Sequence, residues 1–113
     1  MLDNIFDWNL AIARAGGNKD LAHELTGLLA ETIKELKPKI TKAWDAGQFK
    51  EVGELTHKLH GGVAYTGAKH LQVAAKKFEM TTKSGSQDIK AYDDLHAAML
   101  AFEEFVGKLD QNN

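Results

Sequence analysis

Apolar residues recur at intervals of three and four along most of this chain, which is the spacing of one face of an α-helix. Signals for β-structure are weak, because no Asn-Gly or Asp-Gly hairpin turn occurs. The chain contains one proline, Pro38, so little in it would break a helix. The pattern therefore predicts an all-α fold, and the short connections between helices predict antiparallel neighbours.

Five helices are expected, bounded by residues that commonly cap or end helices. Their approximate ranges are 7–15, 18–46, 48–65, 68–84 and 88–109. Asp7 and Asn18 are suited to cap the first two helices, and Gly16 with Gly17 ends the first. Pro38 lies within the second range, where the sequence allows either one long kinked helix or two abutting ones.

The apolar face of each long helix is expected to form the core of the protein rather than a cofactor site. In the second helix this face comprises Leu21, Leu25, Leu28, Leu29, Ile33, Leu36 and Ile40. In the third and fourth helices it comprises Phe49, Val52, Leu55, Leu59 and Val63, and then Leu71, Ala74, Ala75 and Phe78. In the last helix it comprises Ile89, Tyr92, Leu95, Met99, Phe102, Val106 and Leu109.

The size and composition favour one small domain spanning 1–113, since 113 residues with 43% hydrophobic content suffice for one core but not for two. The absence of cysteine leaves no thiol nucleophile, disulfide or thiolate metal site, and it suits the cytoplasm. No segment has the pattern of a signal peptide or a membrane span. A net charge of -2 argues against binding to the phosphate backbone of nucleic acids. No feature demands a dimer, so a monomer is expected.

The third helix contains glycines that a purely structural helix would avoid, because each costs about 1 kcal/mol relative to alanine. Gly53 and Gly61 lie four positions before and after His57, on the same face of the helix. Leu55 and Leu59 each lie two positions from His57. The histidine is therefore expected to point to solvent when the leucines face the core.

An exposed histidine between two glycines suits phosphoryl chemistry. A neutral imidazole nitrogen is a nucleophile near neutral pH, and the missing side chains at Gly53 and Gly61 would let another protein close over the ring of His57. Alternatively, the glycines allow close helix packing and His57 is an ordinary surface residue; the spacing alone favours neither interpretation. Glu54 and His60, three positions to either side, would border the ring in both cases.

A longer motif resembles a known family. The run His57-Lys58-Leu59-His60-Gly61-Gly62, followed by Tyr65-Thr66-Gly67-Ala68 and Leu71, is similar to the signature of histidine-phosphotransfer (HPt) domains. The likeness covers roughly residues 6–109 and points to the C-terminal module of hybrid sensor kinases of the BarA/GacS type. The resemblance implies an antiparallel four-helix bundle with a short extra N-terminal helix, and it implies that His57 accepts the phosphoryl group.

The resemblance also implies a role and its partners. The chain would be a phosphorelay intermediate in two-component signal transduction, taking a phosphoryl group from a receiver-domain aspartate and passing it to a response regulator. The partner receiver domain would supply the magnesium, so no cofactor is expected on this chain. No Gly-rich phosphate loop follows a strand, so no autokinase activity is expected. The sequence fits both a free-standing protein and the C-terminal domain of a membrane sensor kinase, and it does not give the partner or the direction of phosphoryl flux.

One position departs from the family pattern. Many members carry lysine where this chain has His60, and a histidine is only partly charged at neutral pH. Lys58 and Lys69 are expected to supply part of the missing charge. Glu79, where members often have a polar residue, either hydrogen-bonds the ring of His57 and fixes its tautomer or is a solvated surface residue. The expected supporting residues are thus Gly53, Glu54, Lys58, His60, Gly61, Lys69 and Glu79.

Two other functions are compatible with a helical bundle. Three pairs have the i, i+3 spacing of metal ligands in such bundles, namely Asp20 with His23, Glu54 with His57, and Asp93 with His96. Ligands in these bundles point inward, whereas the leucines around His23 and His57 direct both outward and His96 lies at a boundary, so no metal site is expected. The remaining alternative is a helical protein-interaction module in which His57 is dispensable.

Overall fold

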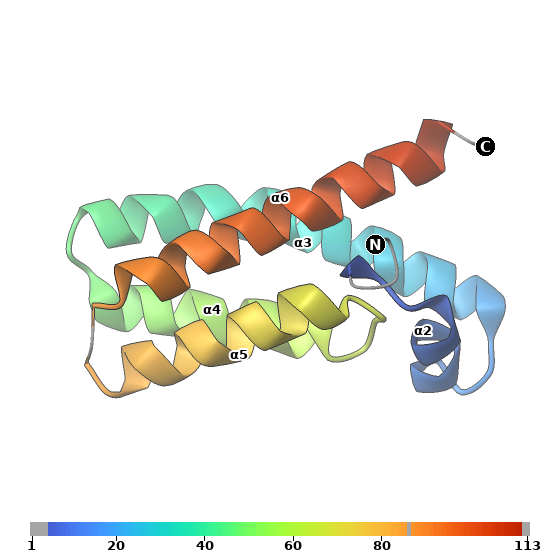
Figure 1. Ribbon diagram of the computed structural model, residues 1–113, viewed down its shortest axis with the longest axis horizontal. Helices are drawn as coiled ribbons and strands as arrows, with labels where there is room; N and C mark the ends of the chain where they lie inside the picture. The colour runs from blue at the N-terminus through green and yellow to red at the C-terminus, as the bar shows by residue number, and fades with distance from the viewer. Residues whose placement is uncertain (1–4, 86, 112–113) are drawn as a thin grey trace.

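The computed structural model describes residues 5–85 and 87–111 and contains five helices (Figure 1). They are α2 (Trp8–Arg14), α3 (Lys19–Asp45), α4 (Phe49–Val63), α5 (Lys69–Lys83) and α6 (Ile89–Gln111). Helices α3 to α6 form an antiparallel bundle in which each packs on the next and α6 returns to α3, while the short α2 packs on α3. The described residues include no strand. The predicted four-helix bundle with a short extra N-terminal helix is confirmed.

The caps expected at the first two helices are present. The side chain of Asp7 accepts a hydrogen bond from the backbone N–H of Leu10 at 3.1 Å, and Asn18 accepts from Leu21 at 2.9 Å. Gly17, which follows α2, has a φ of 86°, a conformation that glycine adopts without steric cost. The chain can therefore reverse between α2 and α3 in a few residues.

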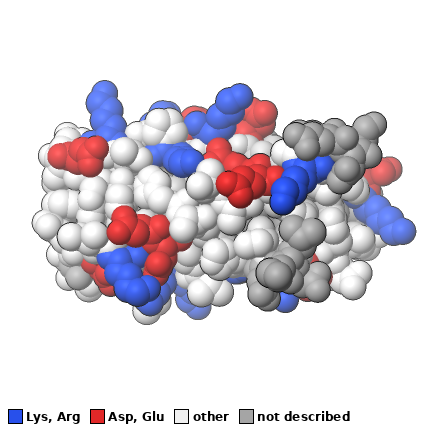
Figure 2. Space-filling view, turned by 45° about the horizontal axis from the view of Figure 1, so that its top comes forward, with Lys and Arg blue, Asp and Glu red and all other residues white. Residues whose placement is uncertain are grey.

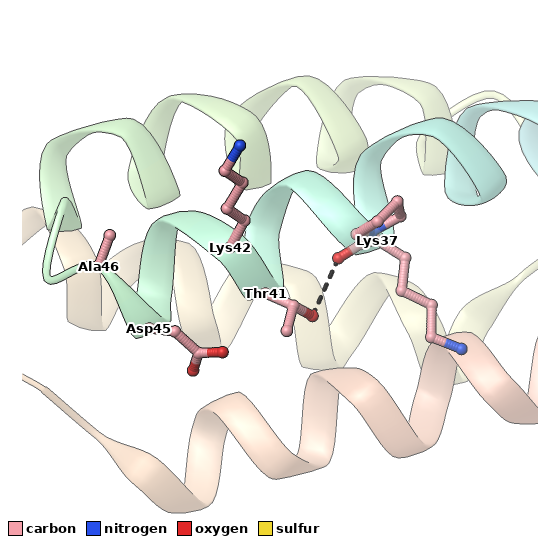
Figure 3. A pocket seen from close by; sticks show the side chains of 6 residues that line it. Lys37, Thr41, Lys42, Asp45 and Ala46 are labelled. Carbon is pink, nitrogen blue, oxygen red and sulfur yellow. Dashed lines mark hydrogen bonds between the residues drawn. The ribbon is translucent and has the colours of Figure 1, made fainter.

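Pro38 lies inside one continuous helix, so of the two arrangements that the sequence allowed, a single long α3 is the one observed. The proline ring is exposed to solvent, so no neighbouring helix has to make room for it. Beside it, the hydroxyl of Thr41 donates to the carbonyl of Lys37 at 3.1 Å (Figure 3). The cost of Pro38 thus falls on the backbone of α3 and not on the packing between helices.

The core follows the predicted apolar faces in most places. Its largest fully buried apolar side chains are Phe78, Phe102, Ile33, Leu36, Ile40, Leu59, Leu71, Leu95, Met99, Val52 and Val63. Three predictions are wrong, because Leu21, Leu28 and Ile89 are exposed. In α3 the smaller Ala22 and Thr26 take the buried positions instead, and Ile89 is exposed as the first residue of α6.

The loop between α4 and α5 is fastened to the N-terminal segment. The backbone N–H of Asp7 donates to the carbonyl of Gly67 at 2.8 Å, and Arg14 donates to the carbonyl of Thr66 at 2.6 Å. A Cβ atom at position 67 would lie 2.1 Å from the carbonyl oxygen of Asp7, so only glycine permits this approach. The segment before α3 therefore covers one end of the bundle.

Charged side chains of both signs are interspersed on the face shown in Figure 2 rather than gathered in one basic field. This distribution agrees with the net charge of -2 and offers no basic surface for nucleic acid there. None of the described helices combines the length and the apolar character needed to cross a membrane.

Candidate functional site

His57 projects from the middle of α4, and its side chain is 73% exposed. The opposite side of the same helix is buried through Val52, Thr56, Leu59 and Val63. Because helical geometry places these residues away from His57, burying them forces the imidazole outward. The predicted orientation of His57 is confirmed.

Glu79 on α5 contacts the rings of two histidines on α4. Its Oε2 lies 2.9 Å from Nδ1 of His57, and its Oε1 lies 3.2 Å from Nδ1 of His60. The side chain of Glu79 is only 8% exposed, and Nζ of Lys83, one turn further along α5, lies 3.5 Å from Oε2. The hydrogen bond expected between Glu79 and the His57 ring is present, and the alternative of a solvated surface glutamate is wrong.

The charge on Glu79 fixes the tautomer of both histidines. Burial raises the pKa of the Glu79 carboxyl, but hydrogen bonds from His57 and His60 and the attraction of Lys83 outweigh it, so the pKa lies below its ordinary value of 4.5. Glu79 is therefore ionised at neutral pH and can only accept hydrogen bonds. Each neutral imidazole must then carry its proton on Nδ1, which leaves the lone pair of Nε2 free. At His57 that nitrogen belongs to the exposed ring.

The two glycines that flank His57 have different surroundings. A Cβ atom at Gly61 would meet no atom within 4 Å, so this position keeps the space beside the ring open. A Cβ atom at Gly53 would lie 3.2 Å from Oγ1 of Thr82 on α5, which is a tight contact. Of the two interpretations of the glycines, open access thus describes Gly61, whereas close helix packing describes Gly53.

An open hollow of about 470 Å³ lies beside His57 between α4 and α5. Its lining comprises Phe49, Lys50, Gly53, Glu54, His57, Thr82 and Lys83. The structure thus places two of the expected supporting residues, Gly53 and Glu54, next to His57 on the same surface. It adds the amino group of Lys83 from the neighbouring helix.

The positive charge near His57 differs from the expected set. Lys69 lies ten residues before Glu79 on α5, about 15 Å along the helix, and its Nζ contacts Asp7 at 3.4 Å. The expectation that Lys69 supplies charge beside His57 is therefore wrong. Lys83 does so instead, and its spacing of four from Glu79 was the signal in the sequence that could have identified it. Lys58 is exposed and follows His57 directly on α4.

The three acid–histidine pairs do not converge. Among the described residues, no group of three or more His, Asp, Glu or Cys side chains is placed to hold a metal ion. His23 is exposed and lies against Trp8, with ring centroids 4.4 Å apart, while His96 is half-buried against Tyr92 on α6. The geometry instead singles out the cluster of His57, His60 and Glu79.

Comparison with known families identifies the family of this chain. A family model described as "Hpt domain" matches residues 19–111. The chain belongs to the Hpt domain family. Hpt domains are phosphocarrier modules of two-component phosphorelays, and those of hybrid kinases interact with receiver domains. The family indicated by the motif that begins at His57 is thereby confirmed.

Similar proteins are sensor kinases much longer than this chain. The signal transduction histidine-protein kinase BarA of Shigella flexneri is 28% identical over 94 residues, which cover 83% of this Hpt domain and 10% of the kinase. The sensor histidine kinase GacS of Pseudomonas protegens is 27% identical over 105 residues, which cover 93% of this chain and 11% of the kinase. The chain thus spans about a tenth of the length of the curated relatives that it matches.

A solved structure supports the fold. The crystal structure of the HPT domain from an Hpt sensor hybrid histidine kinase of Shewanella is similar with a TM-score of 0.76 and 22% sequence identity. The alignment covers 94% of this chain and 97% of the other. The helical bundle described above is therefore the bundle of an Hpt domain.

Proposed function

We propose that His57 is the residue on which this Hpt domain carries a phosphoryl group between receiver domains. The observation that supports the proposal is the pairing of Nδ1 of His57 with the buried carboxylate of Glu79, which leaves a free Nε2 on an exposed ring. An acceptor needs this combination, since the nucleophilic nitrogen must be unprotonated and another protein's active site must be able to reach it. The chain then acts by position and carries no autokinase activity.

The transfer can be followed atom by atom. The lone pair of His57 Nε2 forms a bond to phosphorus, while the bond from phosphorus to the aspartate oxygen of the receiver breaks and its electron pair stays on that oxygen. No proton has to leave, because the proton on Nδ1 remains in its hydrogen bond with Glu79. The ring gains a positive charge in this step, and the adjacent carboxylate stabilises it. The reverse sequence returns the phosphoryl group to a second receiver.

The partner is expected to dock on the surface of α4 around His57, where Gly53, Glu54, Lys58 and Gly61 are grouped on one side of the helix. The interface would be modest and transient, as a carrier that serves two partners requires. Magnesium held by the receiver would supply charge to the phosphoryl oxygens, and the chain itself would bind no cofactor. We extend the proposal to a monomer acting in the cytoplasm, either free or as part of a longer sensor kinase.

The first experiment is incubation of the chain with a phosphorylated receiver domain, comparing wild type with His57→Gln and with the control His70→Gln. His70 is exposed near the start of α5 and takes no part in the proposed site. Acid-labile, base-stable phosphate on wild type and His70→Gln but not on His57→Gln is the expected result. Label that persists in His57→Gln would move the acceptor to His60. No label from any of several receivers would favour an interaction module without phosphotransfer.

A further inference from the structure

The carboxylate of Glu79 is shared between two imidazoles, one exposed and one half-buried. We propose that His60 couples the phosphorylation of His57 to the uptake of a proton, so that a protonated His60 holds the phosphoryl group on His57 more strongly. The inference rests on the proposed function and concerns the regulation of the same site. It makes the balance between chain and receiver depend on pH.

His60 is placed to change its charge in response to His57. Its side chain is 26% exposed, and its Nδ1 bonds the carboxylate oxygen of Glu79 that His57 does not use. The exposed part of the His60 side chain keeps its ring in contact with water. His60 can therefore take up a proton on Nε2 without breaking its bond to Glu79.

Phosphoryl transfer changes the charge that His60 experiences. The phosphoryl group brings two negative charges, and the ring of His57 gains one positive charge, so the net change at His57 is about one negative charge. Side chains three positions apart on a helix lie about 5–6 Å from each other at Cβ. The added negative charge thus favours protonation of His60, and by reciprocity protonation of His60 favours the phosphorylated state of His57.

The other charges around His60 stay constant over the same pH range. On α5, Glu79 remains ionised because its pKa is lowered, and Lys83 beside it and Lys76 one turn before it remain positive. On the other side of α4, helix α3 approaches Gly62 through the apolar side chain of Leu29, and no described residue of α3 pairs with His60. These neighbours therefore keep a constant charge across the pH range in which imidazole side chains in general gain or lose a proton.

The test compares wild type with two variants in which the charge of residue 60 does not change with pH. His60→Lys carries a permanent positive charge, and His60→Gln carries none. For each protein, the equilibrium share of phosphoryl group between a receiver domain and His57 is measured from about pH 6 to about pH 8.5, across the range in which an imidazole titrates. Any effect of pH on the receiver is common to the three proteins, so the ratios between them report the effect of residue 60.

We expect His60→Lys to hold roughly threefold to tenfold more phosphoryl group than His60→Gln, as suits one unit charge near the surface. Wild type should match His60→Gln at high pH and approach His60→Lys at low pH, and the control His70→Gln should follow wild type. If the share of phosphoryl group on wild type relative to His60→Gln did not change with pH, the coupling would be overturned. The proposed function would still stand in that case, because His57 would carry phosphate. Failure of all the proteins to accept phosphate on His57 would overturn the proposed function and this inference together.

Discussion

Glu79 is the one charged side chain among the buried residues that the structure describes. Removal of a carboxylate from water costs several kcal/mol unless hydrogen bonds and opposite charges compensate for it. Here each oxygen of Glu79 accepts from one imidazole, and Lys83 lies close to Oε2. The contacts that allow this burial are the contacts that orient the ring of His57, so Glu79 links the stability of the fold to the chemistry proposed for His57.

Substitution of Glu79 separates its charge from its hydrogen bonds. Glu79→Ala should slow transfer to His57 roughly tenfold to a hundredfold, because the ring loses both its orientation and the charge that stabilises it. Glu79→Gln should fall between this variant and wild type, since its single amide oxygen can accept from only one of the two rings. Single-turnover transfer from a labelled receiver measures both, with circular dichroism as the control for folding. Equal rates in all three proteins would leave Glu79 a purely structural role.

Gly61 permits a direct test of access to His57. Gly61→Leu should raise the free energy of unfolding by up to about 1 kcal/mol, because leucine favours the helix and the site is open. The same side chain should slow phosphoryl transfer about tenfold or more by standing beside the ring. Gly61→Ala is the matched control, as it gains similar helix stability with a much smaller side chain. An undiminished rate in Gly61→Leu would refute the role of Gly61 in access.

The part of this site that depends on α4 alone could be predicted from the sequence. The exposure of His57 follows from periodicity within α4, whereas the contact with Glu79 joins residues 22 positions apart and depends on how α4 packs on α5. For that reason the sequence left Glu79 open between two roles. Lys69 was misplaced for a similar reason, since its partner Asp7 belongs to the N-terminal segment, whose path no helical pattern specifies.

At the scale of elements, α3 shows how a long helix tolerates a proline. Pro38 removes one backbone hydrogen bond, but its ring is exposed, and the residues on the buried face, Leu36 and Ile40, keep their register. The helix therefore stays continuous because the packing of its buried face outweighs one lost bond. Propensity alone could not decide this, which is why the sequence allowed a break at this point.

Replacement of Pro38 measures how much the proline costs the stability of α3. We expect Pro38→Ala to raise the free energy of unfolding by about 1–2 kcal/mol, because the regained hydrogen bond and helix propensity exceed the added freedom of the unfolded chain. Urea denaturation followed by circular dichroism gives the value. Lys34→Ala, an exposed change on the same helix, should stay within about 0.5 kcal/mol of wild type. A loss of stability in Pro38→Ala would mean that the proline shapes α3 in a way that the packing needs.

The ends of the helices were easier to predict than their buried faces. Caps act within a few residues, so Asp7 and Asn18 could be identified locally. The choice between adjacent leucines could not, because Leu28 and Leu29 lie about 100° apart around α3 and only one can face the core. The structure buries Leu29 and exposes Leu28.

At the scale of the whole molecule, the site lies on the flank of the bundle while aromatic contacts close both of its ends. Phe6 stacks on Phe105 of α6 with ring centroids 4.8 Å apart, and Trp44, near the C-terminal end of α3, stacks on Tyr92, near the start of α6, at 4.3 Å. A receiver that docks beside His57 therefore need not open the core. This arrangement suits a carrier that meets two partners in turn.

A histidine between α3 and α6 is expected to make the free energy of unfolding depend on pH. His96 is half-buried there, and its Nε2 has no hydrogen-bond partner among the described residues. Burial lowers the pKa of His96 below its ordinary value of 6.5, and Lys37 lowers it further, against weaker opposing effects of Asp93 and Asp45. The unfolded chain thus binds a proton at His96 more readily than the folded protein, so the free energy of unfolding rises with pH between the lowered pKa and 6.5.

Wild type should therefore lose stability as the pH falls below about 6.5, and His96→Leu, which cannot titrate, should lose less over the same interval. Glu79 also lowers the free energy of unfolding as the solution becomes more acidic, but at lower pH. The contacts of its carboxylate are complete above pH 4.5, and they are lost as the pH falls through its lowered pKa. Urea denaturation at a series of pH values separates the two ranges, and both proteins should share the loss below 4.5. Parallel curves for wild type and His96→Leu above that range would mean that His96 binds its proton equally in the folded and unfolded states, so that its burial between α3 and α6 has no energetic consequence.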